Sequence, residues 1–190
     1  MSKKTIIGIT GRTGSGKSHA CSWINAHIDS VEHLDCDEIG HEILKENPIK
    51  KQLFDIFGND INENDTINRK KLGQIVFNNK EQLFKLNDIV HPKICEIVKK
   101  RIDTTSKKVI IIEGALIHQV GLEHVCNHTI CIDSPTTSIL KRRPDKDIIL
   151  TKQPKANDYI NMCTHTIKNN ANIERFEEKI QQLFERLQLI

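Results

Sequence analysis

The chain has 190 residues, of which 37% are hydrophobic and 28% are charged, and its formal net charge is +3. This length suits one compact domain with room for a helical insertion, and the composition is that of an ordinary globular chain. The small net charge, with basic and acidic residues interspersed, gives no support to nucleic-acid binding. The first apolar run, within residues 5–10, is too short for a signal-peptide core or a membrane span, and the six cysteines form no CxxC pair. We therefore expect a cytoplasmic chain with reduced thiols and no membrane partner.

Five short apolar runs predict buried strands, and the segments between them predict helices. The strands are expected at residues 5–10, 31–35, 109–113, 129–133 and 164–168. Helices are expected at 17–26, 39–57, 69–77, 80–101 and 173–189, with a break in the second at Asn47-Pro48. The alternation favours an α/β fold with a mostly parallel sheet. The stretch from about 39 to 101 is too long for one crossover helix, so we interpret it as a helical substrate-binding insertion. Its Asn- and Asp-rich part, 58–68, predicts a surface turn.

A phosphate-binding motif follows the first predicted strand and opens the first predicted helix. Residues 11–18 match G-x-x-x-x-G-K-[ST] in full, in the strand–helix context that the motif requires. Glycines let the backbone N–H groups turn inward around phosphate oxygens, and the helix N-terminus adds partial positive charge. Lys17 should reach the β- and γ-phosphates, and the Ser18 hydroxyl should bind Mg²⁺. We therefore expect ATP to be bound by Gly11, Arg12, Thr13, Gly14, Ser15, Gly16, Lys17, Ser18 and the adjacent His19.

This motif alone predicts nucleotide binding and not a reaction, because GTPases, motor ATPases and small-molecule kinases share it. A GTPase needs a guanine-reading N-K-x-D, and residues 79–82 (Asn-Lys-Glu-Gln) lack the aspartate. A motor ATPase usually needs a larger domain than 190 residues allow. A small kinase is the favoured class.

Carboxylates follow two of the predicted strands. Asp35 and Asp37 come at the end of the 31–35 strand, and ligands of open α/β sheets gather at the carboxyl ends of strands. One carboxylate there can accept the proton of an attacking hydroxyl, and a neighbour can hold a water on Mg²⁺. The alternative is a helix N-cap. Glu113 ends the third strand, where P-loop proteins often place an acid of the magnesium shell; the alternative is a solvated strand end.

With these motifs in place, the chain resembles the dephospho-coenzyme A kinase family over nearly its whole length. Single matches are modest, but their joint order and spacing are specific. They are Gly8–Gly11 with Gly14–Ser18, residues 35–41, Phe57-Gly58, residues 67–72, Val76-Phe77, His91-Pro92, Leu140-Lys141-Arg142 and residues 167–170. Lys146 departs from the pattern, because it stands where the family often has an arginine.

The resemblance implies a single three-layer P-loop kinase domain, 1–190, with a five-stranded parallel sheet in the order 2-3-1-4-5. It places the nucleotide-binding core at 1–38, 102–141 and 157–190. The helical acceptor-binding insertion then covers 39–101, and a short lid covers 142–156.

The resemblance also implies the reaction: the γ-phosphoryl group of ATP passes to the ribose 3′-hydroxyl of dephospho-CoA, with Mg²⁺ as cofactor. The implied catalytic residues are Asp37 as base, Asp35 beside it, Lys17, and Arg142 as a clamp on the transferring phosphoryl group. Thr10, Asp37, Arg69, His91 and Leu116 would contact the acceptor, and Asn169 and Asn170 would lie near the adenine. Mg²⁺ would be held by Ser18 and, through water, by Asp35 and Glu113.

Several alternatives stay open at this point. His91-Pro92 is also explained as the kink or the restart of a helix, with Pro at its first position, and Arg69 as surface charge. The rival functions are a kinase for another nucleoside or nucleotide, and a nucleotide-binding regulator without catalysis. We expect a monomer or a small homo-oligomer.

Overall fold

The computed structural model describes residues 4–190. Residues 1–3 are outside the described residues, and so is that part of the expectation about a signal peptide which concerns them. The chain divides into two compact units. The first, called here the sheet unit, comprises Met1–Asp35 and Thr104–Ile190, and the second, the helical unit, comprises Cys36–Asp103. Within residues 4–190, none of the helices combines the length and the apolar character that crossing a membrane requires.

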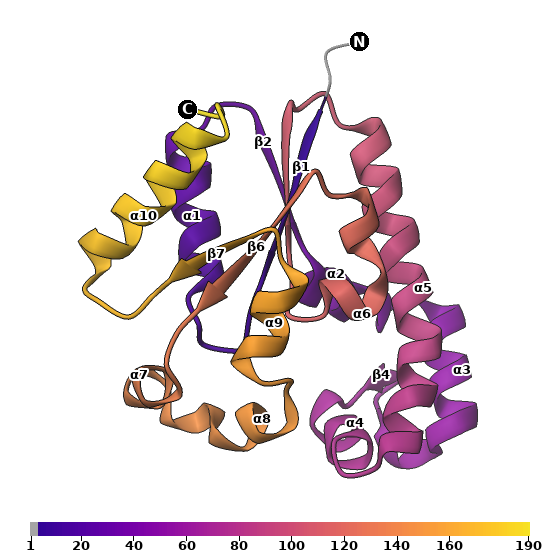
Figure 1. Cartoon of the computed structure of the whole chain (residues 1–190). Helices are drawn as coiled ribbons and strands as arrows, with labels where there is room; N and C mark the ends of the chain where they lie inside the picture. The colour runs from indigo at the N-terminus through magenta and orange to yellow at the C-terminus, as the bar shows by residue number, and fades with distance from the viewer. Residues whose placement is uncertain (1–3) are drawn as a thin grey trace. The chain divides into compact units, whose positions relative to one another are not determined.

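The sheet unit is built on five parallel strands in the order β2-β5-β1-β6-β7 (Figure 1). Numbered among the five predicted strands, this order is 2-3-1-4-5, so the predicted α/β fold and sheet topology are confirmed. The strands are β1 (Thr5–Thr10), β2 (Val31–Asp35), β5 (Val109–Glu113), β6 (His128–Asp133) and β7 (His165–Lys168). Because all five run the same way, their carboxyl ends meet at one edge of the sheet.

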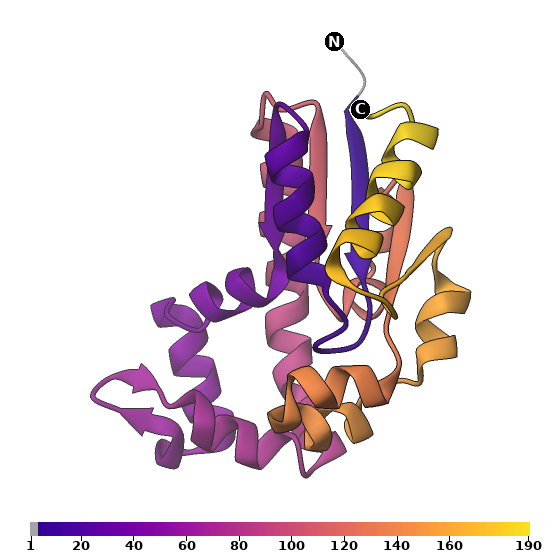
Figure 2. The ribbon, with the colours of Figure 1, turned by 90° about the vertical axis from the view of Figure 1, so that its left-hand side faces the viewer.

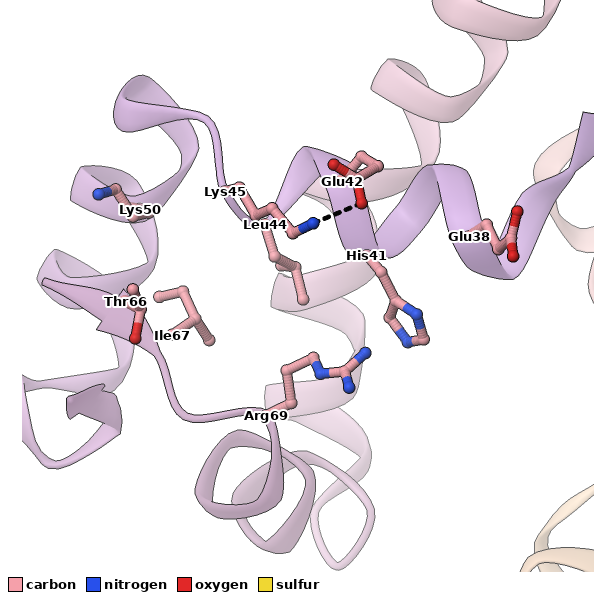
Figure 3. Close-up of a pocket in the computed structure, with 9 residues that line it drawn as sticks. All are labelled: Glu38, His41, Glu42, Leu44, Lys45, Lys50, Thr66, Ile67 and Arg69. Atoms are coloured by element: carbon pink, nitrogen blue, oxygen red, sulfur yellow. Dashed lines mark hydrogen bonds and ion pairs between the residues drawn. The ribbon is translucent and has the colours of Figure 1, made fainter. Parts of the chain in front are cut away.

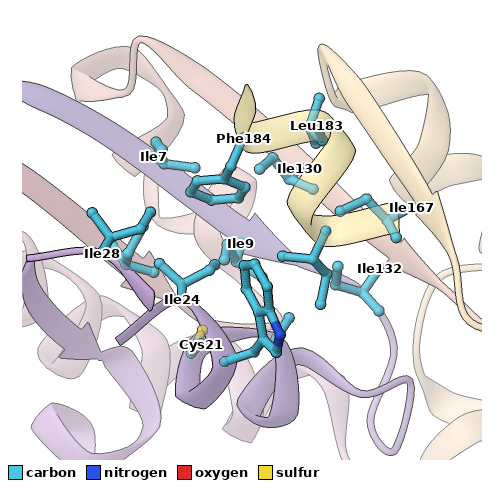
Figure 4. Close-up of a cluster of buried hydrophobic side chains, with 14 of the residues drawn as sticks. Ile7, Ile9, Cys21, Ile24, Ile28, Ile130, Ile132, Ile167, Leu183 and Phe184 are labelled. Carbon is cyan, nitrogen blue, oxygen red and sulfur yellow. The ribbon is translucent and has the colours of Figure 1, made fainter. Parts of the chain in front are cut away.

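Helices α1 (Lys17–His27) and α10 (Ile173–Arg186) cover one face of this sheet, side by side in Figure 2. Their apolar side chains pack on Ile7 and Ile9 of β1 and on the isoleucines of β6 and β7 (Figure 4). Phe176 and Phe184 of α10 are fully buried there. Burial of each such side chain is worth roughly 1.5–3 kcal/mol, so this cluster fixes α1, and with it the glycine loop before it.

On the other face of the sheet, α6 (Ile117–Val120) packs on β1 and α9 (Ala156–Met162) packs on β6 (Figure 1). Gly8 points to this side, where an added Cβ would lie 3.5 Å from Ile117. Tyr159 of α9 is buried. Short segments complete the unit: η2 (Leu122–Val125), α7 (Thr136–Arg142), η3 (Pro144–Lys146) and α8 (Asp147–Lys152). The sheet unit therefore has the three layers that the resemblance implies.

Cys163, the C-cap of α9, is a thiol on this face whose pKa is lowered. A hydrogen bond from the Cys131 thiol lowers the pKa of Cys163 well below its usual range, against the effect of burial. The His118 ring nitrogen Nε2, 3.5 Å from the sulfur, adds to this lowering. Cys126 is the contrasting case, because burial and then the charge of Glu123 raise its pKa to about 12.

We expect iodoacetamide to alkylate Cys163 at least about ten-fold faster than Cys126 at neutral pH, because only the thiolate is the nucleophile. The reaction at Cys163 should persist into mildly acidic solution, since its lowered pKa keeps the thiolate populated there. Peptide mass spectrometry after timed alkylation measures both rates in one sample. Equal rates at the two cysteines would contradict the prediction.

The helical unit, Cys36–Asp103, spans all residues of the predicted insertion, 39–101. Its elements are α2 (Cys36–Ile43), α3 (Asn47–Phe57), η1 (Asn59–Ile61), β3 (Asn62–Glu63), β4 (Thr66–Ile67), α4 (Arg69–Val76) and α5 (Lys80–Thr104). The predicted break before Pro48 is confirmed, since this proline lies in the first turn of α3. The alternative that His91-Pro92 restarts a helix is wrong, because α5 continues through Pro92, and a kink at this proline stays a prediction. The predicted turn at 58–68 contains the antiparallel β3–β4 hairpin.

Candidate active site

The glycine loop between β1 and α1 wraps around the ammonium group of Lys17. Lys17 Nζ donates to the carbonyl oxygens of Gly11 and Arg12, at 3.1 and 3.2 Å. Ser15 N donates to the Arg12 carbonyl at 3.2 Å and closes the turn. Gly11 has φ 138° and an added Cβ there would lie 2.4 Å from the Ile132 carbonyl oxygen, so the turn needs glycine at this position.

Several features of the loop suit a bound polyphosphate. Gly16 is the N-cap of α1, and within residues 4–190 no side chain caps this helix and no acid occupies its first turn. The first N–H groups of the helix therefore keep their capacity for an anion. Ser15 Oγ is buried and has no hydrogen-bond partner in the described part of the chain. Backbone donors, an unpaired buried hydroxyl and the Lys17 ammonium together fit phosphate oxygens.

Ser18 and Glu113 form the carboxylate end of the site. Ser18 Oγ donates to Glu113 Oε1 at 2.7 Å, and His33 Nε2 lies 3.0 Å from Glu113 Oε2. Glu113 is only 4% exposed, so the alternative of a solvated strand end is wrong. Burial acts to raise the pKa of Glu113, but hydrogen bonds from His33, Ser18 and Cys21 outweigh it and hold the pKa below its usual value. Glu113 is thus a carboxylate at neutral pH.

Asp35 lies beside Glu113 at the carboxyl edge of the sheet. The two residues are partners in the parallel register of β2 and β5, and Glu113 pairs in turn with Ile9 of β1, next to the glycine loop. A hydroxyl and two carboxylates are hard oxygen donors of the kind that Mg²⁺ prefers, usually with several waters retained. Ser18, Asp35 and Glu113 are therefore the residues of the sheet unit that fit a magnesium ion.

Two arginines converge on the opposite side of the loop, around Ser134. Arg142 Nη2 donates to the Gly14 carbonyl at 3.2 Å and to Ser134 Oγ at 3.0 Å. Arg12 Nη2 donates to the Ser134 carbonyl at 2.7 Å. Ser134 is fully buried, and no sequence motif predicted it as a site residue. It directly follows the predicted strand at 129–133, and this position at the carboxyl end of a strand is the sequence feature that indicates a site residue.

Asn169 braces the glycine loop from β7. Its Nδ2 donates to the Ser15 carbonyl at 2.8 Å, and its backbone carbonyl accepts from Ser134 Oγ at 2.8 Å. Asn170 Oδ1 accepts from Lys179 Nζ at 3.2 Å. The expected contact of these two asparagines with adenine stays a prediction, while the bond to Ser15 gives Asn169 a structural role.

Other predicted residues of the sheet unit lie around the loop. His19 Nε2 is 2.8 Å from Glu177 Oε1 on α10. Thr10 is buried under the loop, where its hydroxyl donates to the Ala115 carbonyl at 3.4 Å, and Leu116 is the N-cap of α6. A further contact was not predicted: Thr13 N donates to the side chain of Gln153 at 2.8 Å.

The helical unit carries the remaining predicted residues. Asp37 lies in the first turn of α2, which begins at Cys36 and not, as expected, at residue 39. Arg69 is the first residue of α4. His91 lies on α5, where burial lowers its pKa and the charge of Asp88 partly opposes this.

This unit also contains a pocket of about 670 Å³ (Figure 3). Arg69 and His41 point toward each other across it, while Lys45 pairs with Glu42. Lys50 Nζ lies 2.8 Å from Asp65 Oδ2. No motif marked most of these residues in the sequence. The lining residues are Glu38, His41, Glu42, Leu44, Lys45, Lys50, Thr66, Ile67 and Arg69. Three cationic side chains and two carboxylates line the pocket, so the lining has a small excess of positive charge, which suits an anionic ligand.

These features define a P-loop kinase. A glycine loop lies at the carboxyl edge of a five-stranded parallel sheet, before a helix whose N-terminus no described side chain caps. A Ser–Glu pair lies on one side of this loop and arginines lie on the other. Known proteins narrow this class. A family model described as dephospho-CoA kinase matches residues 5–174. A dephospho-CoA kinase from Dehalococcoides mccartyi is 33% identical over 197 residues, covering 97% of this chain and 98% of the relative.

Solved structures agree with these matches. A dephospho-CoA kinase from Campylobacter jejuni superposes with a TM-score of 0.72 and is 25% identical, with 97% of each chain covered. The protein TT1252 from Thermus thermophilus superposes with a TM-score of 0.79 at 21% identity, covering 97% of this chain and 98% of that one, which concerns the fold alone. The chain belongs to the dephospho-CoA kinase family.

Proposed function

We propose that this chain transfers the γ-phosphoryl group of ATP to the ribose 3′-hydroxyl of dephospho-CoA, giving coenzyme A and ADP. The observation that carries the proposal is the Ser18–Glu113 hydrogen bond of 2.7 Å, next to the glycine loop and the uncapped N-terminus of α1. The family to which the chain belongs supports the same reaction. A phosphate cradle and an oxygen site for Mg²⁺ are the two parts that phosphoryl transfer from a nucleotide requires.

The residues of the sheet unit bind and orient the triphosphate in this proposal. The loop amides and Lys17 would bind the β- and γ-phosphate oxygens, and Ser18 would hold the magnesium ion, with Asp35 and Glu113 acting through water. Bound Mg²⁺ would neutralise charge on the β- and γ-phosphate oxygens. Arg142 lies against the Gly14 carbonyl and is placed to stabilise the charge of the transferring phosphoryl group.

Asp37 is the proposed base that accepts the proton of the 3′-hydroxyl. It follows Asp35 by two residues, directly after the strand that ends beside Glu113. A carboxylate is an adequate base here, because the proton leaves as the hydroxyl bonds to phosphorus. Segment 142–156 would act as the lid that excludes water and limits hydrolysis of ATP.

The acceptor is proposed to use the pocket of the helical unit. Arg69, Lys45 and Lys50 line it, and their charges suit the phosphate groups of dephospho-CoA. Thr10, His91 and Leu116 belong to the same proposal as acceptor-binding residues. A cytoplasmic location and a monomeric or small homo-oligomeric state complete it, and light scattering of the purified chain measures the latter.

An acceptor screen tests the proposed reaction. The purified chain is incubated with Mg-ATP and, separately, with dephospho-CoA, adenosine, AMP or dCMP, while ADP is followed and the product is identified by mass spectrometry. We expect ADP formation with dephospho-CoA only, and a product bearing a 3′-phosphate. Turnover with another acceptor would instead support the rival nucleoside or nucleotide kinase, and binding of ATP without any transfer would support the inactive regulator.

Replacement of Arg142 by alanine is expected to lower kcat by about 10²-fold, the usual effect of removing one donor that stabilises developing charge. Arg142→Lys should recover only part of the rate, because lysine keeps the charge but lacks the planar fork of donors. Steady-state rates with dephospho-CoA measure both variants.

Arg143→Ala is the matched control for this prediction. The Arg143 side chain is exposed and pairs with Asp145, at 3.1 and 3.2 Å, away from Gly14 and Ser134. We expect it to keep kcat within about two-fold, since an exposed pair of this kind is worth little. Equal losses in the two alanine variants would show that Arg142 acts only through the general charge of this segment.

A further inference from the structure

One sulfur, one nitrogen and one oxygen donor atom lie close together in the sheet unit, next to Ser18. Cys21 comes from α1, His33 from β2 and Glu113 from β5, and one donor atom of each lies within 4.8 Å of the other two. Cys21 and Glu113 are buried, at 1% and 4% exposure, while the His33 side chain is 29% exposed. The cluster therefore lies in the interior but is open to solvent on the imidazole side.

The fold brings these residues together for clear reasons. His33 lies two residues before Asp35, so both side chains point to the same face of β2, and Asp35 is the register partner of Glu113. Cys21 follows Ser18 by one helical turn, so both face β5 from α1. Glu113 uses Oε1 for Ser18 and Oε2 for His33, and a hydrogen bond from the Cys21 thiol completes the network.

We propose that Cys21, His33 and Glu113 form a binding site for a zinc-class divalent cation, which differs in its ligands from the all-oxygen magnesium site proposed above and shares Glu113 with it. Thiolate, imidazole and carboxylate are the three ligand types of zinc sites, whereas Mg²⁺ is held by oxygen. Three protein ligands leave a fourth position for water, as in open zinc sites. Ser18 then acts as the outer-shell partner that orients the carboxylate.

The geometry is close to what such an ion needs. Zinc bond lengths place the ligand atoms of a tetrahedral site about 3.3–3.6 Å apart. Here His33 Nε2 and Glu113 Oε2 are 3.0 Å apart, and all pairs lie within 4.8 Å.

The competing explanation is a metal-free network that only positions Glu113, and Cys21→Ser separates the two. Serine keeps a hydroxyl donor for Glu113 and hence the network, but it removes the thiolate ligand. The titrations use the full chain carrying Cys163→Ser, which eliminates the thiol beside His118, the other cysteine–imidazole pair described above. Co²⁺ is the probe, because a bound thiolate gives it a charge-transfer absorption band.

We expect the Cys163→Ser chain to bind one Co²⁺ with this band and to release it to Zn²⁺. Outer-shell partners alone change metal affinity by about 10–100-fold, so loss of a ligand should cost at least about 100-fold. Adding Cys21→Ser should therefore abolish the band and weaken Zn²⁺ binding by that factor, with the circular dichroism spectrum unchanged. His33→Asn removes a ligand as well and should weaken Zn²⁺ binding by the same factor of at least about 100, and Cys95→Ser, on α5, should change neither measurement.

A chain without the cobalt band overturns the proposal, and so does a band that persists after Cys21→Ser. If Cys21→Ser fails to fold, His33→Asn decides alone, because its side chain is partly exposed: unchanged Zn²⁺ affinity in that variant also overturns the site. None of these readouts depends on phosphoryl transfer, so their failure leaves the proposed function untouched.

Discussion

Replacement of Asp37 by asparagine is expected to lower kcat by about 10²–10⁴-fold, the usual scale for removal of a general base. Asparagine matches aspartate in size but cannot take up the proton of the 3′-hydroxyl. Because Asp37 lies in the first turn of α2 and not in the glycine loop, the affinity for Mg-ATP should stay within a few-fold. Steady-state turnover with dephospho-CoA and calorimetric titration of Mg-ATP measure the two effects.

Asp55→Asn is the control, since it makes the same change at an exposed residue of α3 in the same unit. It should leave turnover within about two-fold, as surface substitutions usually have small effects. Full turnover by Asp37→Asn would remove Asp37 as the base. A loss confined to the KM for dephospho-CoA would assign Asp37 to acceptor binding alone.

The strands of the sheet could be predicted because strands that are buried on both faces consist almost entirely of apolar residues. All five residues of β5 (Val-Ile-Ile-Ile-Glu) are buried, and such a near-continuous apolar run is typical of a parallel sheet. The start of α2 could not be predicted in the same way. β2 ends at Asp35 and α2 begins at Cys36, with no proline, glycine or loop residue to mark the change. The first turn, with Asp37, was therefore expected outside the helix.

The β3–β4 hairpin shows what a turn signal leaves undetermined. The Asn- and Asp-rich composition of 58–68 predicted a turn, and Asn64 and Asp65 do adopt positive φ, at 50° and 59°. Two successive residues of this kind favour a tight hairpin. Each strand has only two residues, however, which is too few for a period-two pattern to appear in the sequence.

Site residues within one continuous motif could be predicted, and hydrogen bonds between segments distant in the sequence could not. The glycine loop is one continuous motif, so its residues were found directly. The bond from Asn169 to Ser15 joins residues 154 positions apart, and that from Thr13 to Gln153 joins residues 140 apart. Such partners depend on how β7 and the segment after α8 return to the loop, which no pattern near either residue encodes. The cluster of Cys21, His33 and Glu113 escaped notice for the same reason.

Replacement of Gly11 by alanine is expected to lower the free energy of unfolding by about 3–5 kcal/mol, at the upper end of what single substitutions cost, because it combines a steric conflict with a strained backbone conformation. The new Cβ would lie 2.4 Å from the Ile132 carbonyl oxygen, and a backbone atom of a central strand cannot rotate away. The loop must move instead, which displaces the carbonyl that accepts from Lys17. Urea denaturation measures the stability, and titration with Mg-ATP should show a loss of affinity of at least about ten-fold.

Gly121→Ala separates the contact from the backbone conformation. Gly121 also has positive φ, at 77°, but a Cβ there would meet nothing within 4 Å. Alanine at this position should cost only the about 1–2 kcal/mol of a left-handed conformation and leave Mg-ATP binding unchanged. The difference between the two variants is then the cost of the Ile132 contact together with that of the φ of 138° at Gly11, which lies further from the left-handed region than the 77° at Gly121. If Gly11→Ala lost no more stability than Gly121→Ala, the loop would be able to relax around a side chain, and the close approach of β6 would not be what requires glycine at position 11.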